Sequence, residues 1–298
     1  MGIAGRRVHR YLLHALALME SDALHRADLD WPAVRADAVA RCAGAVTYAE
    51  THTVLAEVLR RAGGPHSGLR PPRRNGTAPT AESSTAEPPV AEPPTAEPPT
   101  DELAGGVARL RIPGCAAGRH AYREAGRRLV RALASAEPAG WIVDLRGNRG
   151  GNMRPMLAVV APLLPDGVLG HFVPPERAEQ TWELRRGRIL LAGRVMDRAG
   201  APPGRAADRP LAVLTDGLTA SSGEAVAVAF RARPGVRAFG APTSGMTSAN
   251  QTHRLRDGAL LHLTVAYFAD RARTVYRGPL PVDGPAGAAE AWLRRCGG

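Results

Sequence analysis

A serine-rich turn between an expected strand and an expected helix is the first feature that could carry chemistry. In LAVLTDGLTASSGEAVAVAF (211–230) the apolar run ending at Leu214 is typical of a buried strand, and helical spacing begins near Ser222. A serine at a helix N-terminus lies where free N–H groups and the positive end of the helix dipole favour a developing anion. This position suits a nucleophile whose transition state is an oxyanion, although serine is also an ordinary helix N-cap.

A glycine-rich turn follows a second apolar run. In GWIVDLRGNRGGN (140–152) the expected strand leads into Gly147, Gly150 and Gly151, and a helix is predicted from about Met153. Glycines in such a turn let backbone N–H groups approach a ligand closely, as a phosphate cradle or as part of an oxyanion hole. The P-loop is excluded because its lysine is missing, and the spacing does not fit the dinucleotide fingerprint. A plain tight turn between strand and helix remains the alternative.

Taken together and in this order, the two segments resemble peptidase family S41, the tail-specific or C-terminal-processing serine peptidases. DLRGNRGGN, TASSGE and GAPTSG match successive blocks of the family, and the likeness covers about 105–283. YRGPLPVD resembles the closing Gly-x-x-Pro-Asp block, with Val282 inserted. The resemblance implies an α/β fold with a catalytic core related to the crotonase and Clp-protease architecture.

The resemblance also implies roles for individual residues. The family's nucleophile lies three residues before the glutamate of TASSGE, which maps it to Ser221. The backbone N–H of Ser222 and that of Gly150 or Gly151 would then form the oxyanion hole. Glu224 falls in the first helical turn, where it either orients its neighbours or complements the helix dipole.

The general base is the point on which this sequence departs from many members of the family. Those members use a lysine after Thr-x-Gly, but here Met246 follows Thr243-Ser244-Gly245, and all 39 basic residues are arginine. Histidine is the natural substitute because it titrates near neutral pH. A branch of the family that includes the nisin resistance peptidases and tricorn-like enzymes uses histidine, and Gly64-Pro65-His66-Ser67 resembles the Gly-x-His-Ser segment of the nisin resistance type. His66 is therefore the expected base.

Two further polar residues are candidates for orienting or substrate-binding roles. Asn250 lies four residues after Met246, where it would orient His66, bind substrate backbone or cap a turn. Arg149 flanks the glycine-rich turn, where it would pair with a peptide carboxylate or remain a solvated surface residue.

The chain is predicted to have three parts. Residues 1–70 form an N-terminal helical cap that ends in the His66 loop, with Asp30 as a helix N-cap and Gly63-Gly64-Pro65 as a helix stop. Residues 71–104 form a disordered Pro/Glu-rich linker with TAEPP, VAEPP and TAEPP in succession. Residues 105–298 form the S41-like catalytic domain, in which Asp257-Gly258 joins two strands of a final hairpin. This arrangement leaves no room for a PDZ module.

Composition narrows the class of partner and the location. The formal net charge is +11, but the arginines are dispersed and aromatic residues make up only 4%, so nucleic acid is not the expected partner. No apolar run has the 18 or more residues of a membrane-spanning helix, and no signal peptide is recognised, so a cytoplasmic protein without membrane anchor is expected. Cys42, Cys115 and Cys296 fit neither a disulfide framework nor a metal site. No motif calls for a cofactor, and the oligomeric state is left open.

These observations lead to one hypothesis and several alternatives. We expect a serine-type peptidase that hydrolyses peptides or unstructured protein tails through an acyl-enzyme, with Ser221 as nucleophile and His66 as base. Its activity is expected to fall as His66 becomes protonated, below about pH 6 to 7. The main alternative is a non-catalytic protein on the same fold that binds an apolar ligand or a peptide. A crotonase-like acyl-CoA enzyme and a nucleic-acid binder are the others.

Overall fold

Two structural units make up residues 2–72, 99–199 and 205–296, which the computed structural model describes. The first contains the described residues up to 72 together with 174–176 and 248–266, and the second contains the others. The predicted hairpin therefore groups with the N-terminal helices, whereas the predicted boundaries put all of 105–298 in one domain. Most of the predicted linker, 73–98, lies outside the described residues. Its end was assigned wrongly, because Thr100–Ala104 is a strand.

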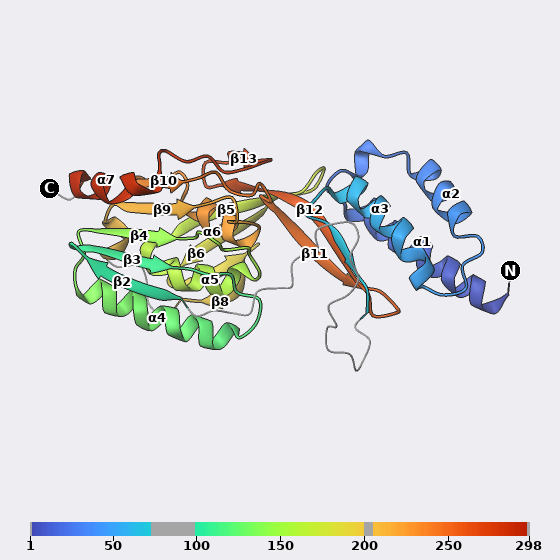
Figure 1. The fold of residues 1–298 in the computed structure, drawn as a ribbon, viewed down its shortest axis with the longest axis horizontal. Coiled ribbons are helices and arrows are strands. Elements are labelled where there is room, and N and C mark those ends of the chain that lie inside the picture. Colours follow the sequence, from blue (N-terminus) through green and yellow to red (C-terminus); the bar gives the residue numbers. More distant parts are fainter. Residues whose placement is uncertain (1, 73–98, 200–204, 297–298) are drawn as a thin grey trace. The chain divides into compact units, whose positions relative to one another are not determined.

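Three helices form most of the first unit (Figure 1). They are α1 (Ile3–Asp22), α2 (Trp31–Arg41) and α3 (His52–Gly63), with short 3-10 turns at Arg26–Asp28 and Ala49–Thr51. Asp30 caps α2 as predicted, because its carboxylate accepts the N–H of Ala33 at 3.2 Å. Helix α3 ends at the predicted stop, where Gly64 has a φ of 75° that glycine adopts at little cost.

The predicted hairpin supplies a sheet to this unit. Strands β1 (Gly68–Arg70) and β11 (Ser248–Arg254) both pair with β12 (Leu260–Asp270). Its turn forms at Asp257-Gly258, with Gly258 at a φ of 88°. The hairpin belongs with the helices because its apolar side chains complete their core. The buried members of that core include Tyr11, Leu12, Leu16, Leu55, Leu59, Leu255, Leu261 and Leu263.

The second unit is built on a five-stranded sheet in the order β10-β9-β4-β3-β2. Its strands are β2 (Thr100–Ala104), β3 (Val107–Arg111), β4 (Gly140–Asp144), β9 (Leu211–Thr215) and β10 (Val236–Gly240). All neighbours are parallel except β2 and β3. Every residue of β4 and β9 is buried, as expected for parallel strands covered on both faces.

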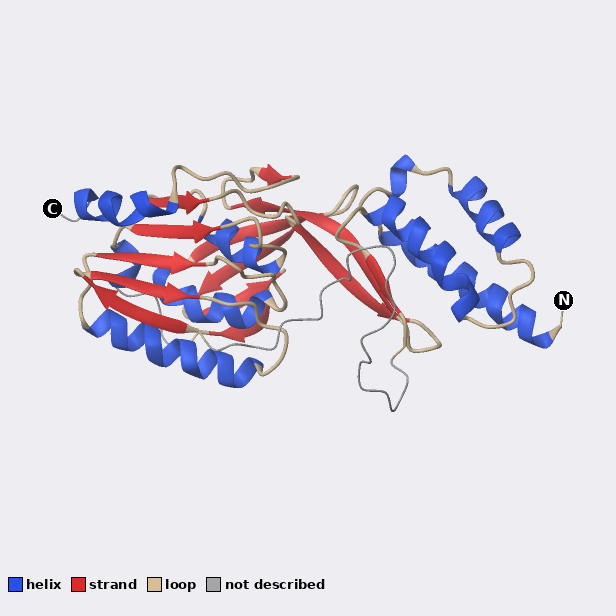
Figure 2. Cartoon of the chain, in the orientation of Figure 1, coloured by secondary structure: helices blue, strands red, loops and turns tan. Residues whose placement is uncertain are grey.

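Helices cover this sheet, as Figure 2 shows. They are α4 (Arg119–Ser135), α5 (Met153–Val160), α6 (Ser222–Phe230) and α7 (Ala289–Cys296), with 3-10 turns at Ala161–Leu163, Arg205–Asp208 and Ala286–Ala288. On one face Trp292 and Leu293 of α7 share a core with Ile142 and Phe239. Helices α5 and α6 also contact a second sheet. No helix within the described residues is long and apolar enough to span a membrane.

Apart from β12, which is the second strand of the predicted hairpin, the strands of the second sheet of this unit were not predicted from the sequence. It contains the antiparallel strands β5 (Gly167–Val173), β6 (Gln180–Arg185), β7 (Arg188–Leu191) and β8 (Arg194–Arg198), together with the end of β12 and β13 (Val275–Tyr276). Its core is aromatic: the ring centroids of Phe172 and Trp182 are 4.9 Å apart, and those of Trp182 and Phe268 are 5.5 Å apart.

The parallel order of β4, β9 and β10 decides where the polar turns lie. Because the carboxyl ends of parallel strands meet at one edge of a sheet, the three loops that follow these strands must lie together there. These loops are 145–152, 216–221 and 241–247. They contain the glycine-rich turn, the serine-rich turn and the Thr-Ser-Gly segment that the sequence singled out.

Candidate active site

Ser221 lies at the N-terminus of α6 in a backbone conformation that is rare for a residue with a side chain. Its φ is 53° and its ψ is −117°, and such a conformation persists only where surrounding contacts enforce it. Two hydrogen bonds hold this turn: the N–H of Ala220 donates to the carbonyl oxygen of Asn148 at 2.9 Å, and the N–H of Ser221 donates to Glu224 Oε2 at 2.8 Å.

Gly150 packs directly against Ser221. A Cβ added at Gly150 would lie 2.9 Å from the Cβ of Ser221 and 3.1 Å from the nitrogen of Ser222. Its φ of 98° also excludes most side chains. Glycine at position 150 therefore lets the glycine-rich turn approach the serine-rich turn at backbone distance.

The backbone donors near Ser221 are not equivalent. The N–H of Gly150 donates to Asn148 Oδ1 at 2.9 Å, so it is not free for an oxyanion. Within the described residues, no acceptor is found for the N–H of Gly151 or for that of Ser222, which begins α6. Ser222 Oγ donates to the carbonyl oxygen of Gly151 at 2.8 Å and so links the two backbones. Of the two glycines predicted as oxyanion donors, Gly151 is the better donor because its N–H has no acceptor among the described residues. Gly150 leaves the space that lets its turn approach Ser221.

Asn148 is a residue that sequence reasoning missed. Its side chain is fully buried, and its Nδ2 donates to the carbonyl oxygen of Ile112 at 2.8 Å, while Oδ1 accepts from Gly150. A buried amide with both ends bonded fixes the loop around it. The available signal was an amide inside an otherwise glycine- and arginine-rich turn.

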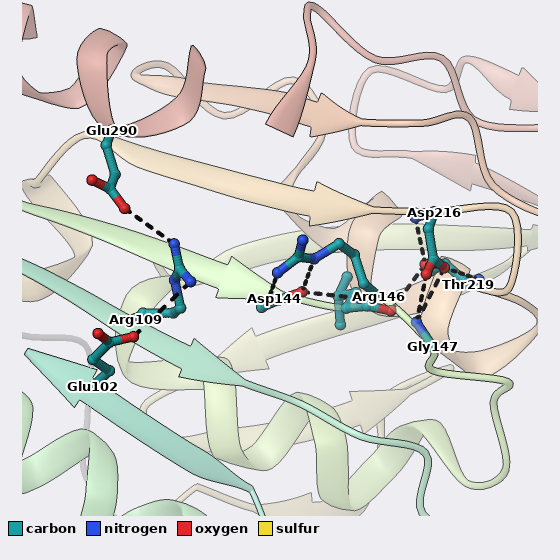
Figure 3. Close-up of polar contacts among 9 residues, drawn as sticks. Glu102, Arg109, Asp144, Arg146, Gly147, Asp216, Thr219 and Glu290 are labelled. Carbon is teal, nitrogen blue, oxygen red and sulfur yellow. Dashed lines mark hydrogen bonds and ion pairs between the residues drawn. The ribbon is translucent and has the colours of Figure 1, made fainter. Parts of the chain in front are cut away.

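Asp216 was also missed, and it connects the loops after β4 and β9 (Figure 3). Its carboxylate accepts the N–H of Gly147 at 3.1 Å and that of Thr219 at 3.0 Å. The hydroxyl of Thr219 donates in turn to the carbonyl oxygen of Leu145 at 2.9 Å. Beside this network, Arg146 pairs with Asp144 at the end of β4, with Nη2 2.6 Å from Oδ2. These bonds anchor the turn at Thr219, two residues before Ser221.

Glu224 joins Ser221 to the third loop. It is fully buried, and its Oε1 accepts the hydroxyl of Thr243 at 2.6 Å and the N–H of Gly245 at 2.8 Å. Burial raises the pKa of the Glu224 carboxyl, and the hydrogen bonds from Thr243, Gly245 and Ser221 act in the opposite direction. Both of its oxygens are used, so the geometry favours the orienting role over a simple interaction with the helix dipole.

His66 lies in the first unit, where the hairpin holds its loop. Its Nδ1 is 2.8 Å from Ser248 Oγ, and Asn250 Nδ2 donates to its carbonyl oxygen at 2.8 Å. The next residue, Ser67, donates its hydroxyl to Thr264 Oγ1 at 2.8 Å. Ser248 was not a candidate from the sequence, because it is 182 residues from His66.

The environment of His66 changes its expected titration. Burial, with a smaller contribution from nearby His262, lowers its pKa to about 4. The sequence-based expectation of a change below about pH 6 to 7 assumed an ordinary histidine. His66 is therefore neutral over the whole physiological range.

The candidate residues separate into two groups. Ser221, Ser222, Gly150, Gly151 and Glu224 come together in the second unit, and His66 and Asn250 come together in the first. Arg149 is exposed and makes no hydrogen bond or ion pair with another described residue. The described residues contain no cluster of three or more His, Cys, Asp or Glu side chains that could hold a metal ion.

Comparisons with known proteins find a family and several similar chains. The model of peptidase family S41 matches residues 106–277. A nisin-resistance protein of Lactococcus lactis subsp. lactis is 31% identical over 271 residues, which are 90% of this chain and 80% of that protein. The structure of a lipoprotein from Streptococcus agalactiae aligns with a TM-score of 0.76 at 23% identity, covering 97% of this chain and 96% of the other. The photosystem II D1 C-terminal processing protease aligns with a TM-score of 0.63 at 16% identity, covering 98% and 97%.

Proposed function

Because the chain belongs to peptidase family S41 and is a serine-type peptidase, we propose that Ser221 is its nucleophile and His66 its general base. The substrates are peptides or unstructured protein tails, which are cleaved through an acyl-enzyme. Ser221 belongs to the second unit and His66 to the first, so the proposal rests on the chemistry of each residue within its own unit.

The conformation of Ser221 is the observation that carries this proposal. A structural helix cap does not need a positive φ, since N-cap residues normally have extended backbone. Here the strained φ of 53° is held by Glu224, and glycine is required at position 150 to make room. Strain of this kind gathers where a side chain must be presented for chemistry.

The proposed reaction follows serine-hydrolase chemistry. His66 takes the hydroxyl proton as Ser221 Oγ attacks the peptide carbonyl carbon, and the N–H groups of Ser222 and Gly151 stabilise the resulting oxyanion. The protonated His66 gives its proton to the leaving amine, which leaves an acyl group on Ser221. A water molecule, deprotonated by His66, then releases the acyl group and regenerates the hydroxyl of Ser221. The low pKa of His66 keeps it neutral before the attack.

Covalent labelling by a fluorophosphonate probe tests the proposal. Wild type is expected to react, whereas Ser221→Ala and His66→Ala are not. Ser135→Ala, on the surface of α4, and His14→Ala, on the surface of α1, serve as controls and are expected to label like wild type. Labelling that persists in Ser221→Ala would refute the nucleophile. Folded wild type that does not label would favour the alternative of a protein that binds peptide or apolar ligand without cleaving it.

The substrate is the next quantity to measure. A library of fluorogenic peptides, read by mass spectrometry of the products, would identify the cleavage preference. Nisin belongs in that set because of the name of the relative that is 31% identical. If no peptide is cleaved by protein that reacts with the probe, the proposed substrate class is wrong. The cytoplasmic location and the absence of a nucleic-acid partner stay predictions from the sequence.

A further inference from the structure

We propose that Ser248 is a positioning residue that selects the ring nitrogen with which His66 acts, holding Nδ1 so that Nε2 is the proton acceptor. This inference rests on the proposed function, because it refines the role of His66 in that reaction. Ser248 itself touches neither substrate nor Ser221 in this account. It acts only through the imidazole ring.

The geometry around His66 separates its two ring nitrogens. Nδ1 is 2.8 Å from Ser248 Oγ, whereas Nε2 makes no hydrogen bond within the described residues. Ser248 is only 7% exposed, so its hydroxyl is not an ordinary solvated group. In the proposed arrangement Nδ1–H donates to Ser248 Oγ, and a histidine whose Nδ1 carries the proton in this way can accept another only at Nε2.

Strand β11 presents this contact as part of a pattern. Alternate residues of a strand face the same side, and Ser248 and Asn250 are two residues apart. Ser248 bonds the ring of His66, while Asn250 bonds its backbone carbonyl. One face of β11 therefore fixes both the side chain and the main chain of the same residue.

The chemical type of the partner matters as much as its place. No described carboxylate forms a hydrogen bond or an ion pair with His66, in contrast to histidines that are paired with an aspartate. A hydroxyl can accept from Nδ1–H in both the neutral and the protonated ring. It therefore keeps the ring oriented through the proton transfer without adding a negative charge that would stabilise the imidazolium. The hydroxyl thus suits a base that is neutral before the attack and releases its proton readily to the leaving amine.

The neighbouring histidine offers a matched control. His262 of β12 has its own hydroxyl partner, because Thr252 Oγ1 is 2.9 Å from His262 Nδ1. Thr252 lies on β11, four residues after Ser248 and on the same face. Thr252→Val thus removes a hydroxyl from the same face of the same strand and a hydrogen bond of the same kind, but leaves the contact between His66 and Ser248 in place.

The first test is ¹⁵N NMR of the full chain labelled at histidine, because the shifts of the two ring nitrogens report the tautomer. The signals of His66 are assigned by their loss in His66→Gln. In wild type at pH 7 we expect a single tautomer with the proton on Nδ1. Ser248→Ala is expected to give a mixture of tautomers, and Thr252→Val to leave His66 unchanged. A wild-type ring with its proton on Nε2, or a tautomer that Ser248→Ala does not alter, would overturn the proposal.

The second test is the rate of fluorophosphonate labelling. Ser248→Ala is expected to slow it roughly tenfold, the effect of losing one orienting hydrogen bond, whereas Ser248→Thr, which keeps the hydroxyl, is expected to restore it. Thr252→Val is expected to stay within about twofold of wild type, since its hydroxyl does not contact His66. An equal loss in Ser248→Thr and Ser248→Ala would overturn the positioning role.

The two proposals can fail separately. If His66→Ala labels like wild type, the base assignment fails, yet the tautomer measurement still reports whether Ser248 controls the ring. If His66→Ala abolishes labelling while Ser248→Ala changes neither the tautomer of His66 nor the labelling rate, the proposed function is supported and the positioning role of Ser248 is refuted.

Discussion

Replacing Glu224 by glutamine tests whether the buried carboxylate holds Ser221 in its strained conformation. In Glu224→Gln the amide oxygen can still accept from Thr243 and Gly245. The amide NH2 group of the variant takes the place of Oε2, which in the wild type accepts the N–H of Ser221 at 2.8 Å. Two donors face each other there, and the bond from Ser221 is lost.

The magnitude follows from that single contact. A hydrogen bond to a charged acceptor contributes about 1.5 to 3 kcal/mol, so we expect the free energy of unfolding to fall by about 2 kcal/mol. Without the bond, Ser221 can relax from its φ of 53°. If the same 2 kcal/mol separates the relaxed from the reactive conformation, labelling by a fluorophosphonate slows about 30-fold. Urea unfolding and the second-order labelling rate measure the two quantities.

Thr243→Val is the matched control. It removes the hydroxyl that donates to Glu224 Oε1 and accepts the N–H of Leu280 at 2.8 Å, but it leaves the bond between Ser221 and Glu224. We expect comparable destabilisation with labelling within about threefold of wild type. Wild-type labelling in Glu224→Gln, or an equally slow rate in Thr243→Val, would refute the reasoning.

Four further predictions use the same two assays. Because the pKa of His66 is about 4, the labelling rate should be flat from pH 8 to about 5 and half-maximal near 4; a midpoint near 6.5 would contradict this. The unfolded chain binds a proton at His66 near pH 6.5, whereas the folded chain binds it only near pH 4. The free energy of unfolding should therefore decrease as the pH is lowered from about 6.5 to about 4, and it should decrease less in His66→Gln. Gly150→Ala should slow labelling by about 30-fold or more, because its Cβ would lie 2.9 Å from that of Ser221 at a φ of 98°; an unchanged rate would exclude the close approach. Asp30→Ala should lower stability by about 1 kcal/mol through loss of the α2 cap, with labelling unaffected.

The elements that carry the site could be predicted because their signals are local. Apolar runs that end in polar or glycine-rich turns predicted the strands β4 and β9 and the helices that follow them. Asp257-Gly258 predicted the hairpin turn, and Asp30 predicted the start of α2. These features depend on residues a few positions apart, so a single sequence contains them. The motifs also predicted the family that the comparisons confirm.

Strands β5 to β8 escaped prediction because their pattern is weak. Strands β7 and β8 are short, β6 to β8 carry arginines, β5 is interrupted by Gly170, and the turns between them, such as Arg186-Gly187, are not strong hairpin signals. Their identity as strands comes from pairing with one another and from the aromatic core around Trp182, which no local window contains. Strand β2 was not predicted because its sequence is acidic, like that of the segment before it.

The sequence by itself identified the candidate residues and their chemical types: a serine at a helix start, glycines in a turn, and a histidine where lysine is absent. Only the tertiary structure decided which partners hold them. Asn148 occupies the N–H of Gly150, Glu224 receives donors from two loops, and Ser248 meets His66 across 182 residues. The physical reason is that a hydrogen bond depends on distance and angle in space, and packing of the whole chain brings together partners that local patterns cannot relate.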